Sequence, residues 1–185
     1  MLRAKAVEIQ QGRFHLGPLD LQFHPGTLSL IRGPNGSGKS SLLRVLMKRR
    51  KPSRGEIHSD ARMVGVVGLE PIFIGSWTLK QNAAFLAGLS GTELNPLSAE
   101  FQKFSSMRVD DLSAGLKRRL ELELMLGLPL DFFFFDEPFN SLDVSGRKQL
   151  ATRLQELRSA GKTLILTTHT EDELLSPPDQ VISLS

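Results

Sequence analysis

The chain has 185 residues, of which 40% are hydrophobic and 23% charged; this balance predicts one globular domain and excludes disordered, collagen-like and coiled-coil proteins. It contains no cysteine, which excludes disulfides, thiolate zinc sites and cysteine nucleophiles and permits a reducing cytoplasmic location. The net charge of +3 is too small to indicate a polyanion, so no nucleic-acid partner is expected, and no apolar run approaches the roughly 20 residues that cross a membrane.

Short apolar runs alternate with longer amphipathic segments, and this alternation predicts an α/β protein with a mostly parallel sheet and crossover helices. In chain order, the predicted elements are a strand over 27–31, a helix from about Lys39, strands over 55–58 and 63–67, a helix over 78–87, a small irregular helical insertion over 88–111, a helix over 116–128, a strand over 132–135, a helix around 150–157, a strand over 163–167 and an edge strand over 181–184. The basic cluster 48–51 is interpreted as the solvated end of the first helix.

The run 132–135 consists of four consecutive phenylalanines. Successive side chains of a strand point to opposite faces of the sheet, so this strand cannot have a solvent-exposed face. The pattern is typical of a central parallel strand that is covered on both sides. Ligands of such sheets bind beyond the carboxyl ends of the strands.

A glycine-rich segment lies between the first predicted strand and helix. It fits the pattern G-x-x-x-x-G-K-[ST] with Gly33, Pro34, Asn35, Gly36, Ser37, Gly38, Lys39 and Ser40. Glycines allow the backbone N–H groups to surround phosphate oxygens, and the N-terminus of the following helix adds positive potential. Lys39 is placed to reach the β- and γ-phosphates, and the Ser40 hydroxyl can ligate Mg²⁺. The segment predicts a site for a nucleoside triphosphate with Mg²⁺.

Two acidic residues, Asp136 and Glu137, follow the phenylalanine strand directly. Asp136 is suited to hold Mg²⁺ and its waters. Glu137 is placed to polarise a water molecule for in-line attack on the γ-phosphate. Together with the glycine-rich segment, this strand end indicates a site that hydrolyses the triphosphate.

Five motifs in order resemble the nucleotide-binding domain of ABC ATPases: the glycine-rich segment, Leu-Ser-Ala-Gly from Leu112, Asp-Glu-Pro from Asp136, Asn-Ser-Leu-Asp from Asn140 and Thr-Thr-His from Thr167. The resemblance covers about residues 5 to 184. It implies a P-loop NTPase with a small antiparallel N-terminal β part, and one ABC ATPase domain over 1–185 with a helical subdomain at about 78–128. Ala114 makes the signature reminiscent of the ATPase of haem-export and cytochrome c maturation systems.

The resemblance implies a role for each matching residue. Residues 33–41, including Ser41, would wrap the phosphates of ATP. Asp136 would position Mg²⁺, and Glu137 would act as the general base. His169 would be the switch histidine that contacts the γ-phosphate. Phe14 would stack on adenine. Ser113 and Gly115 would contact the γ-phosphate that is bound to a second domain in a head-to-tail dimer. The loop around Asp143 would cross the interface of this dimer.

The leading hypothesis is an ATP-hydrolysing subunit of a membrane ABC transporter. It would lie on the cytoplasmic face of the membrane and act on separate transmembrane subunits, which would dock near residues 69–77 and the insertion 78–111. Two alternatives stay open: a soluble, non-transport ABC ATPase, for example of the iron–sulfur assembly type, and a weakly hydrolytic nucleotide-dependent module.

One position departs from the family pattern. The family normally has a glutamine after the strand over 63–67, but alignment on Glu70 and Pro71 places Leu69 there. Leucine can neither ligate Mg²⁺ nor bind water, and the spacing makes Gln81 a doubtful substitute. We therefore expect slow ATP turnover or altered coupling to the transport partner. A steady-state ATPase rate that does not rise in Leu69→Gln would count against this expectation.

Overall fold

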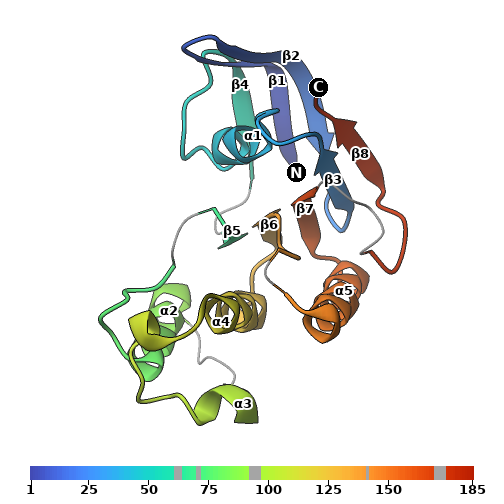
Figure 1. The fold of residues 1–185 in the computed structure, drawn as a ribbon. Coiled ribbons are helices and arrows are strands. Elements are labelled where there is room, and N and C mark those ends of the chain that lie inside the picture. Colours follow the sequence, from blue (N-terminus) through green and yellow to red (C-terminus); the bar gives the residue numbers. More distant parts are fainter. Residues whose placement is uncertain (61–63, 70–71, 92–96, 141, 169–173) are drawn as a thin grey trace.

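The computed structural model describes residues 1–60, 64–69, 72–91, 97–140, 142–168 and 174–185. Its strands form two sheets (Figure 1). The antiparallel sheet has the order β2-β1-β4, with β1 at Leu2–Gln11, β2 at Phe14–Phe23 and β4 at Arg54–Ser59. The parallel sheet has the order β5-β6-β7-β3-β8, with β5 at Val64–Val67, β6 at Phe132–Asp136, β7 at Thr163–Thr168, β3 at Leu28–Arg32 and β8 at Gln180–Ser183.

The helices cover both faces of the parallel sheet. Helix α1 (Lys39–Leu46) lies between the two sheets, and its leucines share a buried cluster with strands of both (Figure 1). Helices α4 (Ala114–Gly127) and α5 (Val144–Ser159) cover the opposite face. Helix α2 (Leu79–Ser90), the short α3 (Ala99–Gln102) and a 3₁₀ turn at Val109–Asp111 form a lobe beside α4. None of the helices described here is long and apolar enough to cross a membrane.

The phenylalanine strand β6 is buried on both faces, as predicted. Phe133 and Phe135 belong to the apolar cluster under α4 and α5, whereas Phe132 and Phe134 belong to the cluster around α1. None of the four side chains is more than 6% exposed. Strand β6 lies second in the sheet, and β7, all six residues of which are buried, occupies the centre. The α/β architecture with a parallel sheet is therefore confirmed.

The insertion between β5 and α4 starts with a well-capped helix. The Thr78 hydroxyl accepts the Gln81 backbone N–H at 3.2 Å, and the Gln81 side chain accepts the Thr78 backbone N–H at 2.9 Å. This reciprocal capping satisfies two N–H groups that the first helical turn would otherwise leave unpaired. The predicted helix over 78–87 thus begins one residue later and extends to Ser90.

Candidate functional site

The glycine-rich loop joins the end of β3 to the start of α1, at the carboxyl edge of the parallel sheet. Gly36 and Gly38 have φ angles of +86° and +93°, a backbone region that other residues rarely adopt. At Gly33, a side chain would come within 2.5 Å of Ser37 Oγ and 2.7 Å of the Leu184 carbonyl oxygen. The glycines are therefore required by the backbone path, which turns the loop back onto the N-terminus of α1.

The Ser37 hydroxyl lies inside this loop. The side chain is buried, and the hydroxyl oxygen has no hydrogen-bond partner among the residues that the structure describes. Buried polar atoms are nearly always paired in folded proteins, so an unpaired one in a loop of this shape is consistent with a polar ligand nearby. The loop backbone itself is held by a 3.2 Å hydrogen bond from the Ser37 N–H to the Pro34 carbonyl.

Lys39 connects the loop to the acidic end of β6. Its ammonium group donates hydrogen bonds to the carbonyls of Gly33 (2.8 Å) and Pro34 (3.2 Å) and forms an ion pair with Glu137 Oε1 at 3.3 Å. Its side chain is only 7% exposed. The structure thus brings together the lysine of the glycine-rich loop and the predicted general base, which are 98 residues apart in the sequence.

Thr167, on β7, orders the acidic pair at the end of β6. Its hydroxyl donates to Asp136 Oδ1 at 2.6 Å and accepts the backbone N–H of Glu137 at 3.0 Å. Glu137 has a φ angle of +47°, a strained conformation for a residue with a side chain. Strain of this kind persists only where neighbouring groups fix the backbone, and it occurs preferentially at functional sites.

The residues present fit Mg²⁺. The predicted ligands, the Ser40 hydroxyl and the Asp136 carboxylate, are hard oxygen donors, and each is the sequence neighbour of one member of the Lys39–Glu137 ion pair. No cluster of three or more His, Cys, Asp or Glu residues suited to a metal occurs in the described part of the chain. Mg²⁺ bound with a nucleotide needs none, because it typically takes one or two protein oxygens, phosphate oxygens and water.

Phe14 packs directly against the glycine-rich loop. It is the first residue of β2, and a side chain at Gly38 would come within 2.5 Å of its ring atom Cζ. The ring is partly buried against the cluster around α1. Its position beside the phosphate loop is compatible with the predicted adenine contact, although this packing would also support the loop without any nucleotide.

The signature motif lies at the start of α4. Ser113 is exposed and caps the helix by accepting the Leu116 N–H at 3.2 Å, and Gly115 follows in the first turn. The Leu116 side chain packs against the core cluster. The Asp143 carboxylate caps α5 by accepting the Gly146 N–H at 2.7 Å. Ser113 and Asp143 therefore stand at exposed helix N-termini.

The structure bears on two further predictions, those for Leu69 and Gln81. Leu69 is 8% exposed and packs into the cluster around α1, so a glutamine there would bury an amide, and a Leu69→Gln experiment needs a stability control. The amide oxygen of Gln81 accepts hydrogen bonds in the α2 cap, so Gln81 cannot substitute for the glutamine that the family has at position 69.

His169 and Ser141 lie outside the described residues.

Sequence reasoning missed one residue of the site. Arg118, in the second turn of α4, donates from Nη2 to the backbone carbonyls of Asp136 and Glu137, both at 3.1 Å. The sequence carries a weak signal for it: Arg118 and Glu121 are charged residues three apart on a helix that is otherwise buried on much of its circumference. Such pairs usually lie on solvent-exposed helix faces, so their spacing alone does not indicate a functional site.

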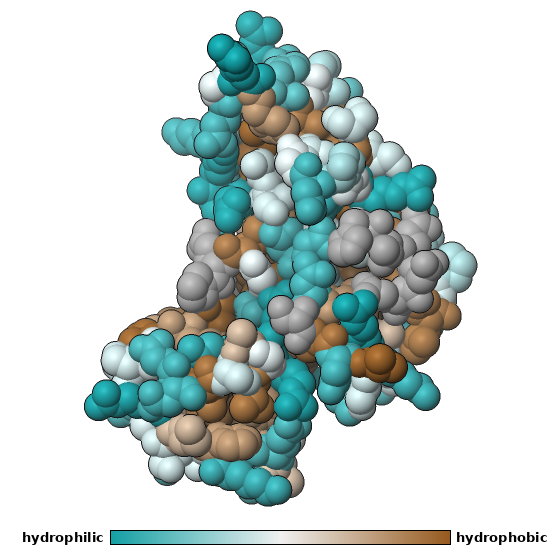
Figure 2. Space-filling model, in the orientation of Figure 1, coloured by the Kyte–Doolittle hydropathy of each residue, from teal (hydrophilic) through white to brown (hydrophobic). Residues whose placement is uncertain are grey.

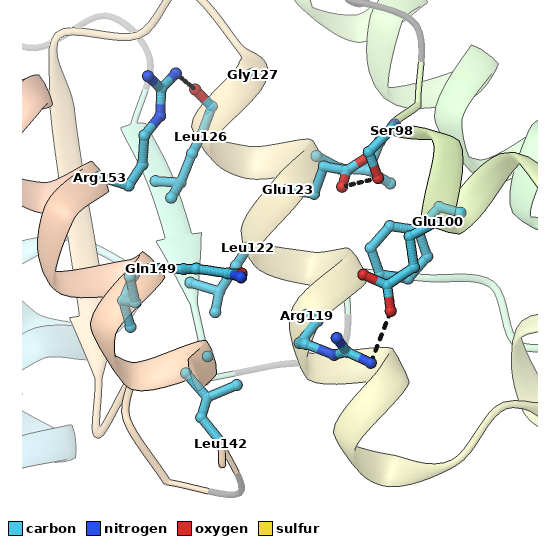
Figure 3. Close-up of a pocket in the computed structure, with 14 residues that line it drawn as sticks. Ser98, Glu100, Arg119, Leu122, Glu123, Leu126, Gly127, Leu142, Gln149 and Arg153 are labelled. Carbon is cyan, nitrogen blue, oxygen red and sulfur yellow. Dashed lines mark hydrogen bonds and ion pairs between the residues drawn. The ribbon is translucent and has the colours of Figure 1, made fainter. Parts of the chain in front are cut away.

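A hollow of about 410 Å³ between α3, α4 and α5 lies apart from these residues (Figure 3). Apolar side chains such as Leu122 and Leu142 line it, together with polar groups that pair with each other. Arg119 pairs with Glu100 at 2.8 Å, and the Ser98 hydroxyl donates to Glu123 at 2.7 Å. We assign the chemistry to the glycine-rich loop and the end of β6 instead.

The chain matches known proteins over most of its length. The family model "ABC transporter" matches residues 16–140. The chain is 33% identical over 190 residues to the cytochrome c biogenesis ATP-binding export protein CcmA of Pseudomonas syringae pv. syringae (strain B728a), which covers 91% of this chain and 87% of that protein. It is 36% identical over 176 residues to the Nod factor export ATP-binding protein I of Cupriavidus metallidurans (strain ATCC 43123 / DSM 2839 / NBRC 102507 / CH34), covering 84% of this chain but only 58% of that one.

The fold is also similar to solved structures. The dimeric structure of MJ0796, a bacterial ABC transporter cassette, superimposes with a TM-score of 0.83 at 22% identity and covers 100% of this chain and 94% of that chain.

Proposed function

Because this chain belongs to the ABC transporter family, we propose that it is the subunit that binds and hydrolyses ATP to drive a separate membrane-spanning partner. Membership in this family makes the chain an ABC-type ATPase, and both relatives named above are ATP-binding proteins of export systems. The observation that carries the proposed mechanism is the ion pair between Lys39 and Glu137, because it joins the phosphate loop to the acidic strand end.

The glycine-rich loop binds the triphosphate. Residues 33–41, whose backbone N–H groups other than at Pro34 can donate, and the N-terminus of α1 surround the phosphates, and the Lys39 ammonium contacts the β- and γ-phosphates. The buried Ser37 hydroxyl supplies one more polar group inside the loop. Phe14, against Gly38, stacks on adenine.

Ser40 and Asp136 hold Mg²⁺, which when bound neutralises charge on the phosphates. Glu137 orients a water molecule and accepts its proton as the water oxygen bonds to the γ-phosphorus. The bond from the γ-phosphorus to the bridging oxygen breaks, which leaves ADP and phosphate. His169 contacts the γ-phosphate in this scheme.

A second ABC domain completes each site. Ser113 and Gly115 lie at an exposed helix N-terminus, which presents N–H groups and a hydroxyl outward. Such a terminus is suited to bind an anion, and in a head-to-tail pair it faces the γ-phosphate held by the partner. In the simplest assembly the partner is another copy of this chain, and the loop at Asp143 lies at the interface.

The lobe formed by α2 and α3 carries the contact with the membrane subunit. Five large hydrophobic side chains there are between 36% and 62% exposed: Ile74, Trp77, Phe85, Leu89 and Met107. Figure 2 shows hydrophobic side chains at the surface of this lobe. Beside it, Leu69, Ile72 and Phe73 line a hollow of about 390 Å³ against α4. Phe73 is half-buried and Trp77 exposed, so residues 69–77 remain suited to docking.

This docking would place the chain at the cytoplasmic face of the membrane, held there by its partner. Residues 1–185 would act as one ABC ATPase domain, with the helical subdomain at about 78–128 relaying motion to the membrane subunit.

The function is tested by measuring phosphate release from ATP with Mg²⁺, with Lys39→Met as the variant that lacks the phosphate-binding charge. We expect release by the native chain and loss of both ATP binding and release in Lys39→Met. ATP binding without phosphate release would favour the nonhydrolytic module. Hydrolysis by a chain that never copurifies with a membrane protein from detergent extracts would favour a soluble ABC ATPase.

Phe14→Ala is expected to weaken ATP binding about tenfold, since stacking of a base on an aromatic ring contributes about 1–3 kcal/mol. Isothermal titration with ATP measures the effect. Inorganic tripolyphosphate, which has no base, is the matched ligand. If Phe14→Ala weakens tripolyphosphate as much as ATP, the ring supports only the loop and does not contact adenine.

A further inference from the structure

A buried ion pair lies in the middle of the signature helix. Arg118 and Glu121 of α4 are joined by a 2.7 Å contact between Nη1 and Oε2, and their side chains are only 12% and 11% exposed. Removing two charges from water costs free energy that a single contact rarely returns, so stability alone does not explain such a pair. The other hydrogen bonds of both side chains indicate what it does.

The pair joins three segments of the chain. Arg118 Nη2 donates to the carbonyls of Asp136 and Glu137, at 3.1 Å each, while Glu121 Oε1 accepts the backbone N–H of Gly68 at 2.9 Å. The planar guanidinium group, with its fixed fork of donors, can hold a carboxylate and two carbonyls at once. The pair thus links α4 to the end of β6 and to the segment that follows β5.

Gly68 shows how closely this network is packed. Its φ angle is +91°, and a side chain there would collide with the Asp136 carbonyl oxygen and lie 2.8 Å from both terminal nitrogens of Arg118. Because residue 68 is a glycine, there is room for the Arg118 guanidinium group to contact the end of β6.

Arg118 fixes the strained backbone of Glu137 from one side. The N–H of Glu137 is shared by the hydroxyl and the carbonyl of Thr167, at 3.0 and 3.2 Å, and its carbonyl accepts the Asn140 N–H at 3.1 Å as well as Arg118 Nη2 at 3.1 Å. Its φ angle of +47° is retained only if the surroundings determine it. Because the backbone sets the direction of the side chain, this set of hydrogen bonds, to which Arg118 contributes a charged donor, helps to determine where the carboxylate lies relative to Lys39.

We propose that Arg118 is a positioning residue that holds Glu137 in its catalytic orientation, and that Glu121 positions Arg118 in turn. The inference rests on the proposed function, in which Glu137 is the general base. Ser113 caps α4, so the same helix that offers its N-terminus to a partner's nucleotide is hydrogen-bonded to the backbone of the catalytic residue of its own chain.

The test is the steady-state ATPase rate of Arg118→Met in the full chain. Misplaced catalytic groups typically cost 10- to 100-fold in rate, so we expect kcat to fall by about 10- to 100-fold. The KM for ATP should change by less than about twofold, because the glycine-rich loop is untouched. Glu121→Gln, which retains an acceptor for Gly68 but no charge for Arg118, should lower kcat less.

Two variants separate positioning from stability. The double variant Arg118→Met/Glu121→Met removes both buried charges, so its denaturation midpoint should recover toward the native value while kcat stays low. Arg118→Lys keeps a charge beside Glu121 and should fold even where the methionine variants do not. Its single ammonium group cannot reproduce the fork, so kcat should again be low.

Arg153 and Glu156 on α5 provide the matched control. They have the same residue types, the same spacing and a 2.8 Å contact, but their side chains are 46% and 56% exposed. Arg153→Met should leave kcat within about twofold of the native value.

The inference is overturned if a folded Arg118 variant keeps kcat within about twofold of the native chain, or if the double variant recovers its rate together with its stability. Glu137→Gln is measured in parallel. If it too retains turnover, the proposed function itself has failed; if it is inactive while the Arg118 variants are active, only the positioning role is wrong.

Discussion

Replacing Glu137 by glutamine is expected to lower phosphate release at least about 100-fold while leaving ATP bound, since a positioned general base contributes about 10²- to 10⁴-fold to the rate. Glutamine is nearly isosteric but cannot accept the proton of the attacking water. It also removes the negative charge next to Lys39. With hydrolysis blocked, ATP should hold two chains together, which light scattering after chromatography in ATP would detect as a doubled mass.

Asp131→Asn is the matched control for this variant. Asp131 precedes β6 at the opposite end of the strand and pairs with Lys162 at 2.9 Å, with its carboxylate 85% exposed. The rate should not change. A Glu137→Gln chain that still releases phosphate within tenfold of the native rate would contradict the assignment of the base, and one that stays monomeric in ATP would contradict the composite site.

Ser113→Arg is expected to reduce hydrolysis at least about 100-fold without weakening the binding of ATP to the monomer. The substitution removes the hydroxyl from an exposed helix N-terminus and fills the space in front of it with a long side chain. Nothing in the glycine-rich loop of the same chain is altered. ATP affinity by titration and phosphate release at saturating ATP together measure the two effects.

Loss of the helix cap is a separate consequence, because the Ser113 hydroxyl accepts the Leu116 N–H. Such a loss costs about 1 kcal/mol of stability, so the denaturation midpoint must be measured as well. Ser113→Thr retains a hydroxyl and a cap and should retain most activity. Unchanged hydrolysis in Ser113→Arg would show that the signature helix does not contribute to the site.

Most of the fold could be predicted from the sequence where one pattern permits a single environment. Four consecutive phenylalanines can only occupy a strand that is covered on both faces, and β6 has this arrangement. Likewise, the family and the fold class are confirmed. The order of strands was not predictable, because β3 pairs with β7 and β8, which come more than 130 residues later.

The candidate site was predictable in its residues but not in its geometry. The spacing of Gly33, Lys39 and Ser40 indicates phosphate binding, and the Asp-Glu pair at the end of β6 indicates a metal and a base. The contact between Lys39 and Glu137 depends on how β3, β7 and β6 are ordered, which is a property of the folded sheet. The roles of all these site residues stay predictions, as do those of His169, Phe14 and Asp143.

The Arg118 network lay beyond sequence reasoning for a physical reason. A pair of opposite charges three residues apart usually stabilises an exposed helix surface, and only tertiary structure shows that this one is buried. The left-handed backbone of Glu137 is equally invisible, because glutamate is not a residue whose presence signals a positive φ angle. Both features arise where α4 meets the end of β6.

In the proposed dimer, each ATP is hydrolysed between the phosphate loop of one chain and the signature helix of another. The direct test is phosphate release by an equimolar mixture of Ser113→Arg and Glu137→Gln chains, each inactive alone. A mixed dimer contains one intact site, so random pairing should restore about a quarter of the native rate. A mixture no faster than either variant alone would contradict the account.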